Sequence, residues 1–345
     1  MQLFLDGKAI EAQCGETLLT LVRRAGLDSL DMARRPLAAQ IGGDIYTLNV
    51  DPVHETPTGI EPRQAVRRAQ GQIKLLRYGD DLGRRVYERT LQYVLFMALR
   101  QLWPKAKVQV NYSLGPGLYI TVEKEPDLSQ DDINQLDACC RAIVRQDLPL
   151  LRERLDIQAA IDFYQKEGQE DKVRLLRWRK FNYFDCYRQG DYLDYFYGEM
   201  APSTGYVQVF SIQLESPGLI LCMPDDEDPN KPGVYHRSPK FAAVFAQSDQ
   251  WGRLLHCGNV ADLNEMVENG SIRELIRINE ALHEKRYAAI ADDIVCRGAR
   301  AVMVAGPSSS GKTTSANRLY THLRVLGKNP VLISLDNYYI DRDKI

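Results

Sequence analysis

The spacing of apolar residues in the first sixty positions changes from a strand period to a helix period and back. Alternation over 3–12 is broken by the turn-forming pair Asp6-Gly7, which predicts a β-hairpin. A helical apolar period follows over 17–26, and Gly42-Gly43 divides a second expected hairpin. This β-β-α-β-β order predicts a β-grasp module over residues 1–60, at the start of a chain of mixed α/β and α+β class.

Longer periodic segments follow and predict a second, α+β domain over 61–225. Helices are expected at 86–103, at 129–144 and within 146–180, and strands at 107–111, at 117–122 and within 191–222. A connector of loop and helix is expected over 226–298, ending in a long helix from Ile272 to about Cys296 that Gly298 would cap. The acidic residues 225–228 indicate either solvated surface or a weak metal site.

A phosphate-binding loop is predicted near the end of the sequence. A continuous apolar run at 301–305 is typical of a buried parallel strand, and a helical period follows over 314–326. The residues between them fit the pattern G-x-x-x-x-G-K-[ST] in the strand–loop–helix context that this motif needs. They are Gly306, Pro307, Ser308, Ser309, Ser310, Gly311, Lys312 and Thr313.

The chemistry expected of this loop is binding of ATP with Mg²⁺. Gly306 and Gly311 permit backbone angles that let successive N–H groups converge on phosphate oxygens, and the helix N-terminus adds its positive end. We expect Lys312 to reach the β- and γ-phosphates, the Thr313 hydroxyl to bind Mg²⁺, and Thr314 to complete the binding segment.

A second apolar run at 331–335 predicts another parallel strand, and Asp336 follows it directly. An acid at the carboxyl end of such a strand faces the ligand crevice, where it can act as a general base or on Mg²⁺ through water. The alternative is an aspartate that caps a helix or turn. Residues 299–345 are therefore expected to be the start of a P-loop NTPase domain with a parallel α/β sheet.

The loop Gly306–Thr314 together with 333–339 resembles the uridine kinase/phosphoribulokinase family. The resemblance implies ATP-dependent phosphoryl transfer to a nucleoside hydroxyl, with Lys312 and Asp336 as the catalytic residues. It covers only residues 299–345. Because a P-loop kinase needs several parallel strands, we expect the natural protein to continue beyond Ile345 and this chain to be inactive by itself. A truncated adaptor, or completion by another chain, are the alternatives.

The rest of the sequence resembles threonyl-tRNA synthetases. Residues 1–60 are similar to their TGS module, and 86–215 to the domain after it, with landmarks at 101–104, 115–119 and 192–202. In the synthetases, a histidine pair, a cysteine and a further histidine in that domain edit mischarged tRNA. The corresponding positions here are Arg89, Tyr93, Phe196 and Met200, which implies a scaffold or binding surface without editing. The combined architecture resembles a group of bacterial nucleoside kinases.

The charges leave a second function open. The formal net charge is only −2, so a basic surface must be local. The segment 61–85 is basic and is either a solvated linker and helix face or a contact for RNA. Likewise, the aromatic and basic residues of 177–197 either pack in a core or stack on bases. The alternative function is thus an RNA- or tRNA-binding regulatory protein with nucleotide-dependent switching and no kinase activity.

The sequence also indicates a compartment. The first ten residues lack a signal peptide's basic start and apolar stretch, and the longest apolar run, near 93–98, is too short to span a bilayer. The seven cysteines form no Cys-x-x-Cys pair, which is typical of free thiols in a reducing compartment. We therefore expect a cytoplasmic protein that binds ATP and a nucleoside-like acceptor and has no membrane contact. Nothing in the sequence indicates an oligomeric state.

Overall fold

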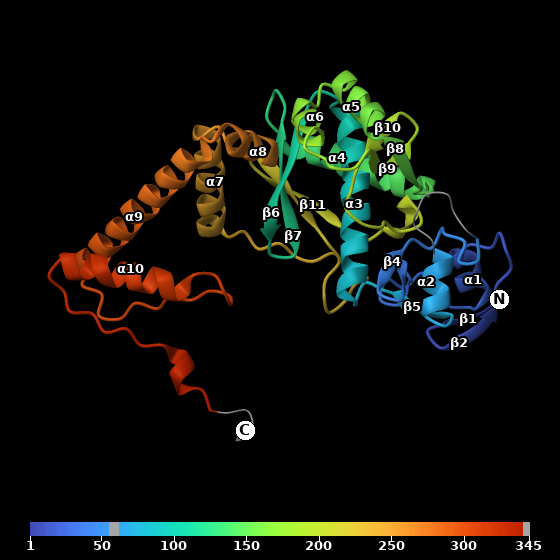
Figure 1. Cartoon of the computed structure of the whole chain (residues 1–345), viewed down its shortest axis with the longest axis horizontal. Coiled ribbons are helices and arrows are strands. Elements are labelled where there is room, and N and C mark those ends of the chain that lie inside the picture. Colours follow the sequence, from blue (N-terminus) through green and yellow to red (C-terminus); the bar gives the residue numbers. More distant parts are fainter. Residues whose placement is uncertain (55–61, 341–345) are drawn as a thin grey trace. The chain divides into compact units, whose positions relative to one another are not determined.

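The computed structural model describes residues 1–54 and 62–340, and the chain divides into two compact units, Met1–Lys240 and Phe241–Ile345 (Figure 1). The predicted domain boundary between residues 60 and 61 and the last five residues of the predicted P-loop domain lie outside the described residues. No helix of the described part is both long and apolar enough to cross a membrane.

The N-terminal module of the first unit is a five-stranded sheet in the order β2-β1-β5-β3-β4. The predicted hairpin is confirmed, because β1 pairs antiparallel with β2. The central strand β5 comes from beyond residue 60, from the basic segment 61–85, for which a solvated linker and helix face or a contact for RNA was expected and no strand. The elements are β1 (Gln2–Leu5), β2 (Lys8–Glu11), α1 (Leu18–Arg24), β3 (Ala38–Ile41), β4 (Asp44–Tyr46), α2 (Pro62–Arg68) and β5 (Gln72–Leu76).

The remainder of the first unit is built around one long helix, α3 (Asp81–Leu102). One sheet has the order β11-β12-β7-β6 and the other β10-β9-β8. The elements are β6 (Lys107–Leu114), β7 (Gly117–Glu123), α4 (Gln130–Gln146), β8 (Arg152–Asp156), α5 (Ile157–Lys166), α6 (Glu170–Leu176), β9 (Tyr183–Gln189), β10 (Tyr192–Asp194), the 3-10 helix η1 (Thr204–Tyr206), β11 (Ser211–Glu215) and β12 (Gly218–Cys222).

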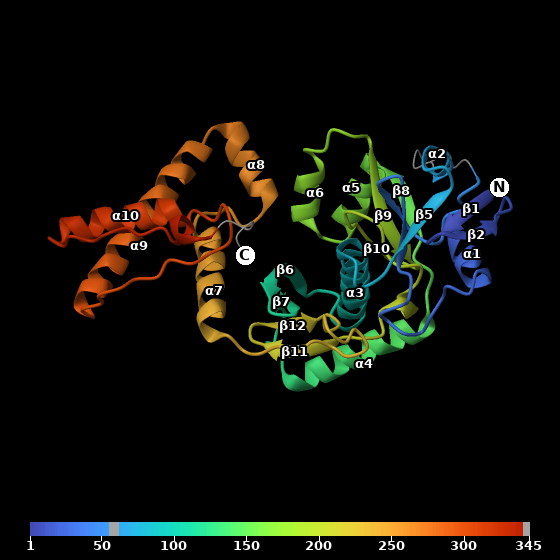
Figure 2. The same ribbon diagram turned by 90° about the horizontal axis from the view of Figure 1, so that it is seen from below.

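Helix α3 lies inside this part of the unit rather than on its surface. Figure 2, which looks nearly along α3, shows α4, β11 and β12 on one side of it and α5, β9 and β10 on the other. Its buried residues belong to one core with α4 and the four-stranded sheet, to which Ile120, Ile133, Leu136 and Leu221 contribute. The helix is therefore held from several directions at once.

Specific polar contacts join the N-terminal module to the rest of the first unit. The Asn49 amide donates to the carbonyl oxygen of Pro202 at 2.7 Å, and Arg35 Nη1 donates to that of Gly205 at 3.2 Å. The Arg35 guanidinium also lies 3.8 Å from the centre of the Tyr206 ring. These contacts explain why both parts cluster as one compact unit.

The second unit is mainly helical. It comprises α7 (Pro239–Leu254), which begins just before the unit boundary, α8 (Val260–Asn269), α9 (Ile272–Cys296), α10 (Lys312–Val325) and the 3-10 helix η2 (Leu335–Tyr338). The predicted helix from Ile272 to Cys296 is confirmed as α9. Asn259 caps α8 with a reciprocal capping box, because its side chain accepts from Asp262 N while the Asp262 carboxylate accepts from Asn259 N.

The prediction of two parallel strands at 301–305 and 331–335 is wrong for this structure. Neither segment forms a strand, and residues 335–338 form η2 instead. Their apolar side chains are exposed, among them Met303 at 79% and Val331 at 80%. A strand exists only when its backbone pairs with a neighbour, and the described residues of this unit supply no such ladder.

Two further differences concern the middle of the chain. Strands β8 and β9 lie where only helices, or no element, are expected from the sequence, because residues 152–156 carry charges and little alternation. Within the predicted strands of 191–222, residues 204–206 form η1 and only β10, β11 and β12 are strands.

The start of α3 generates a prediction about Gly83. A Cβ built on Gly83 would lie 1.9 Å from the carbonyl oxygen of Arg77. Alanine favours a helix over glycine by about 1 kcal/mol, but this overlap forces the backbone to move, so Gly83→Ala should lower the free energy of unfolding by about 2 kcal/mol. Urea unfolding followed by circular dichroism measures the change.

Gly79 supplies the matched control, because its Cβ would meet nothing within 4 Å. Gly79→Ala should change stability by less than about 0.5 kcal/mol. Equal stability of the Gly83→Ala and wild-type chains would contradict the close packing of this turn.

Candidate functional site

The predicted phosphate loop, Gly306–Thr313, lies in the second unit at the start of α10. The helix begins at Lys312, and Gly311 precedes it at the N-cap with φ of +83°, a left-handed conformation that glycine adopts without a steric cost. Ser309 also has a positive φ, of +60°. The described loop therefore places Lys312, Thr313 and Thr314 in the first turn of a helix of 14 residues.

The side chains of the loop are arranged around its backbone. Lys312 Nζ donates to the carbonyl oxygen of Pro307 at 2.7 Å, which holds the ammonium group over the loop. A Cβ on Gly306 would lie 2.7 Å from Ser310 Oγ, so a side chain at 306 would force that hydroxyl to move. The Lys312 ammonium group and the N-terminus of α10 therefore lie beside the same short loop.

Helix α10 is fixed to α9 by a small polar group. The hydroxyls of Tyr287 and Ser315 share a hydrogen bond of 2.9 Å. Glu284 of α9 pairs with Arg318 at 2.9 Å and with His322 Nε2 at 3.0 Å. The position of the helix N-terminus is thus set by side chains that follow the motif by only two to nine residues.

Asp336 is not brought to the loop by the interactions of the described residues. It lies in η2, and its surroundings are exposed. The apolar run 331–335 predicts Asp336 at the end of a parallel strand beside the loop, but that run does not form a strand in the described fold. Its role as a general base remains a prediction.

A second group of residues forms where α3 meets the chain between β10 and η1, and it includes the four positions singled out by the synthetase resemblance. The Tyr93 and Phe196 ring centres are 6.0 Å apart, and Met200 is fully buried in the same core. Arg89 Nε donates to the carbonyl oxygen of Glu199 at 3.0 Å, and Arg89 Nη1 to that of Tyr197 at 3.2 Å. The structure therefore brings all four positions together.

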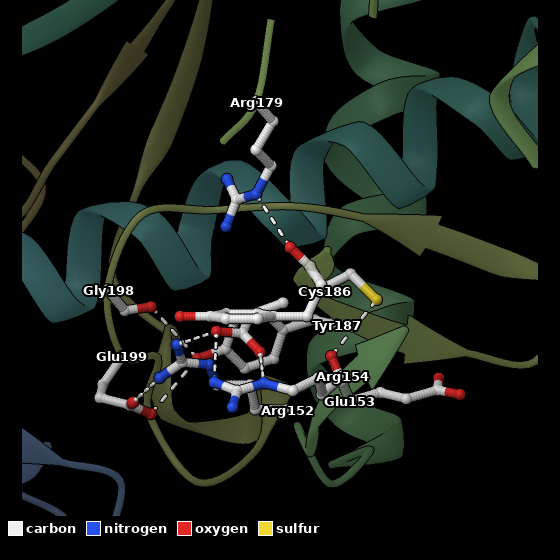
Figure 3. A network of polar contacts seen from close by, with 10 residues as sticks. Arg152, Glu153, Arg154, Arg179, Cys186, Tyr187, Gly198 and Glu199 are labelled. Atoms are coloured by element: carbon white, nitrogen blue, oxygen red, sulfur yellow. Dashed lines mark hydrogen bonds and ion pairs between the residues drawn. The ribbon is translucent and has the colours of Figure 1, made fainter. Parts of the chain in front are cut away.

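Figure 3 shows the polar network that continues from this point into β8 and β9. Arg152 donates through Nη1 to Glu199 Oε1 and through Nη2 to Asp185 Oδ2, both at 2.6 Å. Arg154 Nε donates to Asp185 Oδ1 at 2.7 Å. The Tyr187 hydroxyl donates to the carbonyl oxygen of Gly198 at 3.2 Å. No motif in the sequence points to Arg152, Asp185 or Glu199, and the strands β8 and β9 that carry the first two are not among the predicted elements.

The second group is largely buried, and this burial changes the pKa values of its side chains. Burial, followed by the nearby Glu199 carboxylate, raises the pKa of Tyr187 far above its ordinary range, so its hydroxyl stays a neutral donor. Burial lowers the pKa of the Arg89 guanidinium. A cavity of about 370 Å³ lies further along α3, where Met97, Gln101, Phe163 and Tyr192 are among the lining residues. The four synthetase-like positions supply neither a thiol nor an imidazole.

The remaining predicted sites are placed as follows. In the basic segment, Lys74 pairs with Asp80, Arg77 with Asp6, and Arg84 with Asp226, so three of its cations already have acidic partners. In the acidic segment, Asp225 Oδ1 accepts from the backbone N–H groups of Glu227 and Asp228, as in a turn. Across 1–54 and 62–340, no group of three or more His, Cys, Asp or Glu residues is placed to hold a metal ion.

Comparison with known proteins shows distant similarity to threonine–tRNA ligases. The chain is 30% identical to that of Carboxydothermus hydrogenoformans over 143 residues, which is 41% of this chain and 23% of the relative. It is 26% identical to that of Desulforamulus reducens over 201 residues and 27% identical to that of Acetivibrio thermocellus over 208 residues, or 58% and 60% of this chain. No protein-family model matches the sequence.

These matches cover 23 to 30% of the length of the relatives, so the chain spans less than a third of each. The sheets of the first unit, antiparallel except for the β1–β5 pair, are consistent with the TGS-like and editing-like region that the sequence resembles.

The Arg152–Asp185–Arg154 group generates a prediction about pH. Burial opposes the charge of Asp185, but the hydrogen bonds from Arg154 and Arg152 outweigh it, and the pKa of Asp185 is lowered. A lowered pKa in the folded state contributes stability above the unfolded value, near 3.9, and that contribution is lost as pH falls through the folded value. Asp185→Asn should therefore cost about 2 kcal/mol at pH 7.

The difference in free energy of unfolding between wild type and Asp185→Asn should stay constant from pH 7 to about 5 and shrink below about pH 4. Urea titrations at each pH measure it. Asp191→Asn, which removes an exposed carboxylate from the neighbouring turn, should change stability at pH 7 by less than about 0.5 kcal/mol. A difference that grows on acidification would contradict the ion-pair assignment.

Proposed function

We propose that the protein binds ATP with Mg²⁺ at the loop Gly306–Thr314 and serves ATP-dependent phosphoryl transfer to a nucleoside hydroxyl. The observation that supports this most is the coincidence of an unbroken motif with a helix N-terminus. Gly311 takes the left-handed conformation at the N-cap of α10, and Lys312 begins the helix with its ammonium group over the loop. A helix that begins at the motif lysine is one part of the context in which this motif binds phosphate.

In this proposal each residue of the site has a separate role. The loop N–H groups and the α10 N-terminus bind the β- and γ-phosphates, and Lys312 balances the charge on the transferring group. The Thr313 hydroxyl holds Mg²⁺, which would neutralise charge that develops on the phosphates. Asp336 accepts the proton of the acceptor hydroxyl as that oxygen bonds to the γ-phosphorus and ADP leaves.

Nucleotide binding is tested on the chain itself by titration calorimetry with ATP and MgCl₂. Removing the ammonium group in Lys312→Ala should weaken ATP binding at least about 10-fold, because a charge-assisted contact to phosphate is lost. Lys328→Ala removes an exposed lysine just after α10 and should leave the affinity unchanged. The absence of ATP binding by the wild-type chain would overturn the whole proposal.

Transfer is tested separately, with the protein in its natural length, γ-labelled ATP and a panel of nucleosides including uridine and cytidine. Asp336→Asn should keep ATP binding and lose transfer by about 100-fold or more, because the acceptor proton loses its base. If ATP binds but no nucleoside is labelled, the kinase part of the proposal fails and nucleotide binding stands alone. The alternative of a regulatory, RNA-binding protein would then be favoured.

A further inference from the structure

The segment between α6 and β9 carries an unusual combination of charge and aromatic rings. From Lys172 to Phe184 the sequence has five cations, four aromatic residues and no acid. From the sequence alone, these aromatics either pack in a core or stack on bases. In the structure, some of the rings are buried and others are exposed, so the two groups can be told apart.

Five rings form two groups at the start of β9 and in the chain after β10, and we call the two groups together the ring ladder. At one end the ring centres of Phe181 and Tyr183 are 5.6 Å apart. At the other end Phe184 and Tyr195 are 5.0 Å apart, and Tyr195 and Tyr197 are 5.6 Å apart. The centre is buried, since Phe184 is only 2% exposed.

Arg179 joins the two halves of the ladder. Its guanidinium carbon lies 5.9 Å from the ring centre of Phe181, 5.8 Å from that of Tyr183 and 5.3 Å from that of Phe184. Its Nε donates to the carbonyl oxygen of Tyr183 at 2.9 Å, which fixes its plane. Cation–π contacts of this kind hold the rings in place without covering their outer faces.

The two ends of the ladder face solvent. Phe181 is 60% exposed and Tyr197 is 75% exposed, so each presents a free ring. The backbone beneath Tyr197 is nonetheless fixed, because Arg89 Nη1 donates to its carbonyl oxygen at 3.2 Å. Exposed aromatic rings on a fixed backbone cost little ordering entropy when a flat partner stacks on them.

We propose that the ring ladder is a binding surface for single-stranded nucleic acid. Unpaired bases stack on Phe181 and Tyr197, and the exposed side chains of Arg177 and Lys180 meet the phosphates. Charge favours this occupant over an apolar protein surface, because the exposed cations Arg177 and Lys180 lie close to Phe181 in the sequence, whereas Lys172 is already paired with Asp194. A duplex does not fit, since its bases are stacked on one another and show no free face.

The proposal is tested by fluorescence anisotropy with the whole chain and labelled 12-nucleotide U and dT oligomers, with a 12-base-pair duplex as comparison. Both single strands should bind more tightly than the duplex at 50 mM KCl and lose affinity at 200 mM. Phe181→Ala and Tyr197→Ala should each weaken binding by about 5- to 150-fold, the range measured for loss of one stacked base.

Matched variants separate stacking from other effects. Phe181→Tyr keeps a ring and should bind like wild type, whereas Phe181→Leu keeps apolar area without a ring and should behave like Phe181→Ala. Lys180→Ala should reduce the slope of log affinity against log salt by about 1. Leu30→Ala, at a residue 83% exposed elsewhere in the first unit, should have no effect.

Three results would overturn the proposal: no binding of either single strand at 50 mM KCl, equal binding of the duplex, or unchanged affinity in both ring variants. The last result would place nucleic-acid binding elsewhere, for instance on the basic segment 61–85. Lys312→Ala should bind the oligomers like wild type, so the outcome is independent of the proposed ATP site.

Discussion

Helix α3 can take only one position in the first unit, because residues on nearly all of its faces are buried against different neighbours. Only Asp81 and Arg85 are exposed between its start and Leu99. The hydroxyl of Thr90, fully buried in the middle of the helix, donates to the carbonyl oxygen of Val86 and accepts from the backbone N–H of Ala201 at 2.9 Å. Because close-packed interiors have little free volume, any displacement of α3 would also displace residues of both sheets.

The polar network around Glu199 depends on that fixed helix. Arg89 projects from α3 to the backbone of residues 197 and 199, and Arg152 reaches the same loop from β8. Two strands and a helix from separate parts of the sequence therefore converge on one short loop. These contacts hold Tyr197 beside Tyr195 in the ring ladder, and Tyr93 packs against Phe196 at two of the four positions singled out by the synthetase resemblance.

The second unit is organised in the opposite way. Few of its residues are buried, and Ala261, Ala291 and Leu323 are the buried apolar residues of its described part. The predicted phosphate loop does not need a deep core, because its geometry follows from Gly311, the start of α10 and local hydrogen bonds. The predicted position of Asp336 beside that loop, in contrast, would need a strand with a partner, which the described residues of this unit do not form.

This contrast explains how much could be predicted from the sequence. The hairpin at Asp6-Gly7, the helix capped at Thr17 and the helix Ile272–Cys296 were predicted correctly, because turn chemistry, caps and a helical period are local signals. Strand β5 was missed although it is the centre of its sheet, since basic residues flank its apolar positions and its pairing is with distant strands. The runs 301–305 and 331–335 have strand composition, but composition alone cannot supply a partner.

The loop was likewise predictable from its motif, and the convergence of Arg89, Tyr93, Phe196 and Met200 followed from resemblance to a family. The charged residues that surround these four positions could not be predicted from the sequence. Arg152, Asp185 and Glu199 belong to no motif, and only the pairing of β8 with β9 brings the first two together.

The contact between Arg89 and Gly198 has an evolutionary consequence. Gly198 has φ of +112°, and a Cβ there would lie 2.9 Å from the Arg89 guanidinium carbon, so the arginine occupies the space of the missing side chain. Any side chain at 198 would be strained by the left-handed backbone even if the arginine moved aside. A small residue at 89 would leave a void beside Tyr187. Related chains that keep this loop should therefore keep glycine at 198, and at 89 a side chain long enough to fill the space beside it.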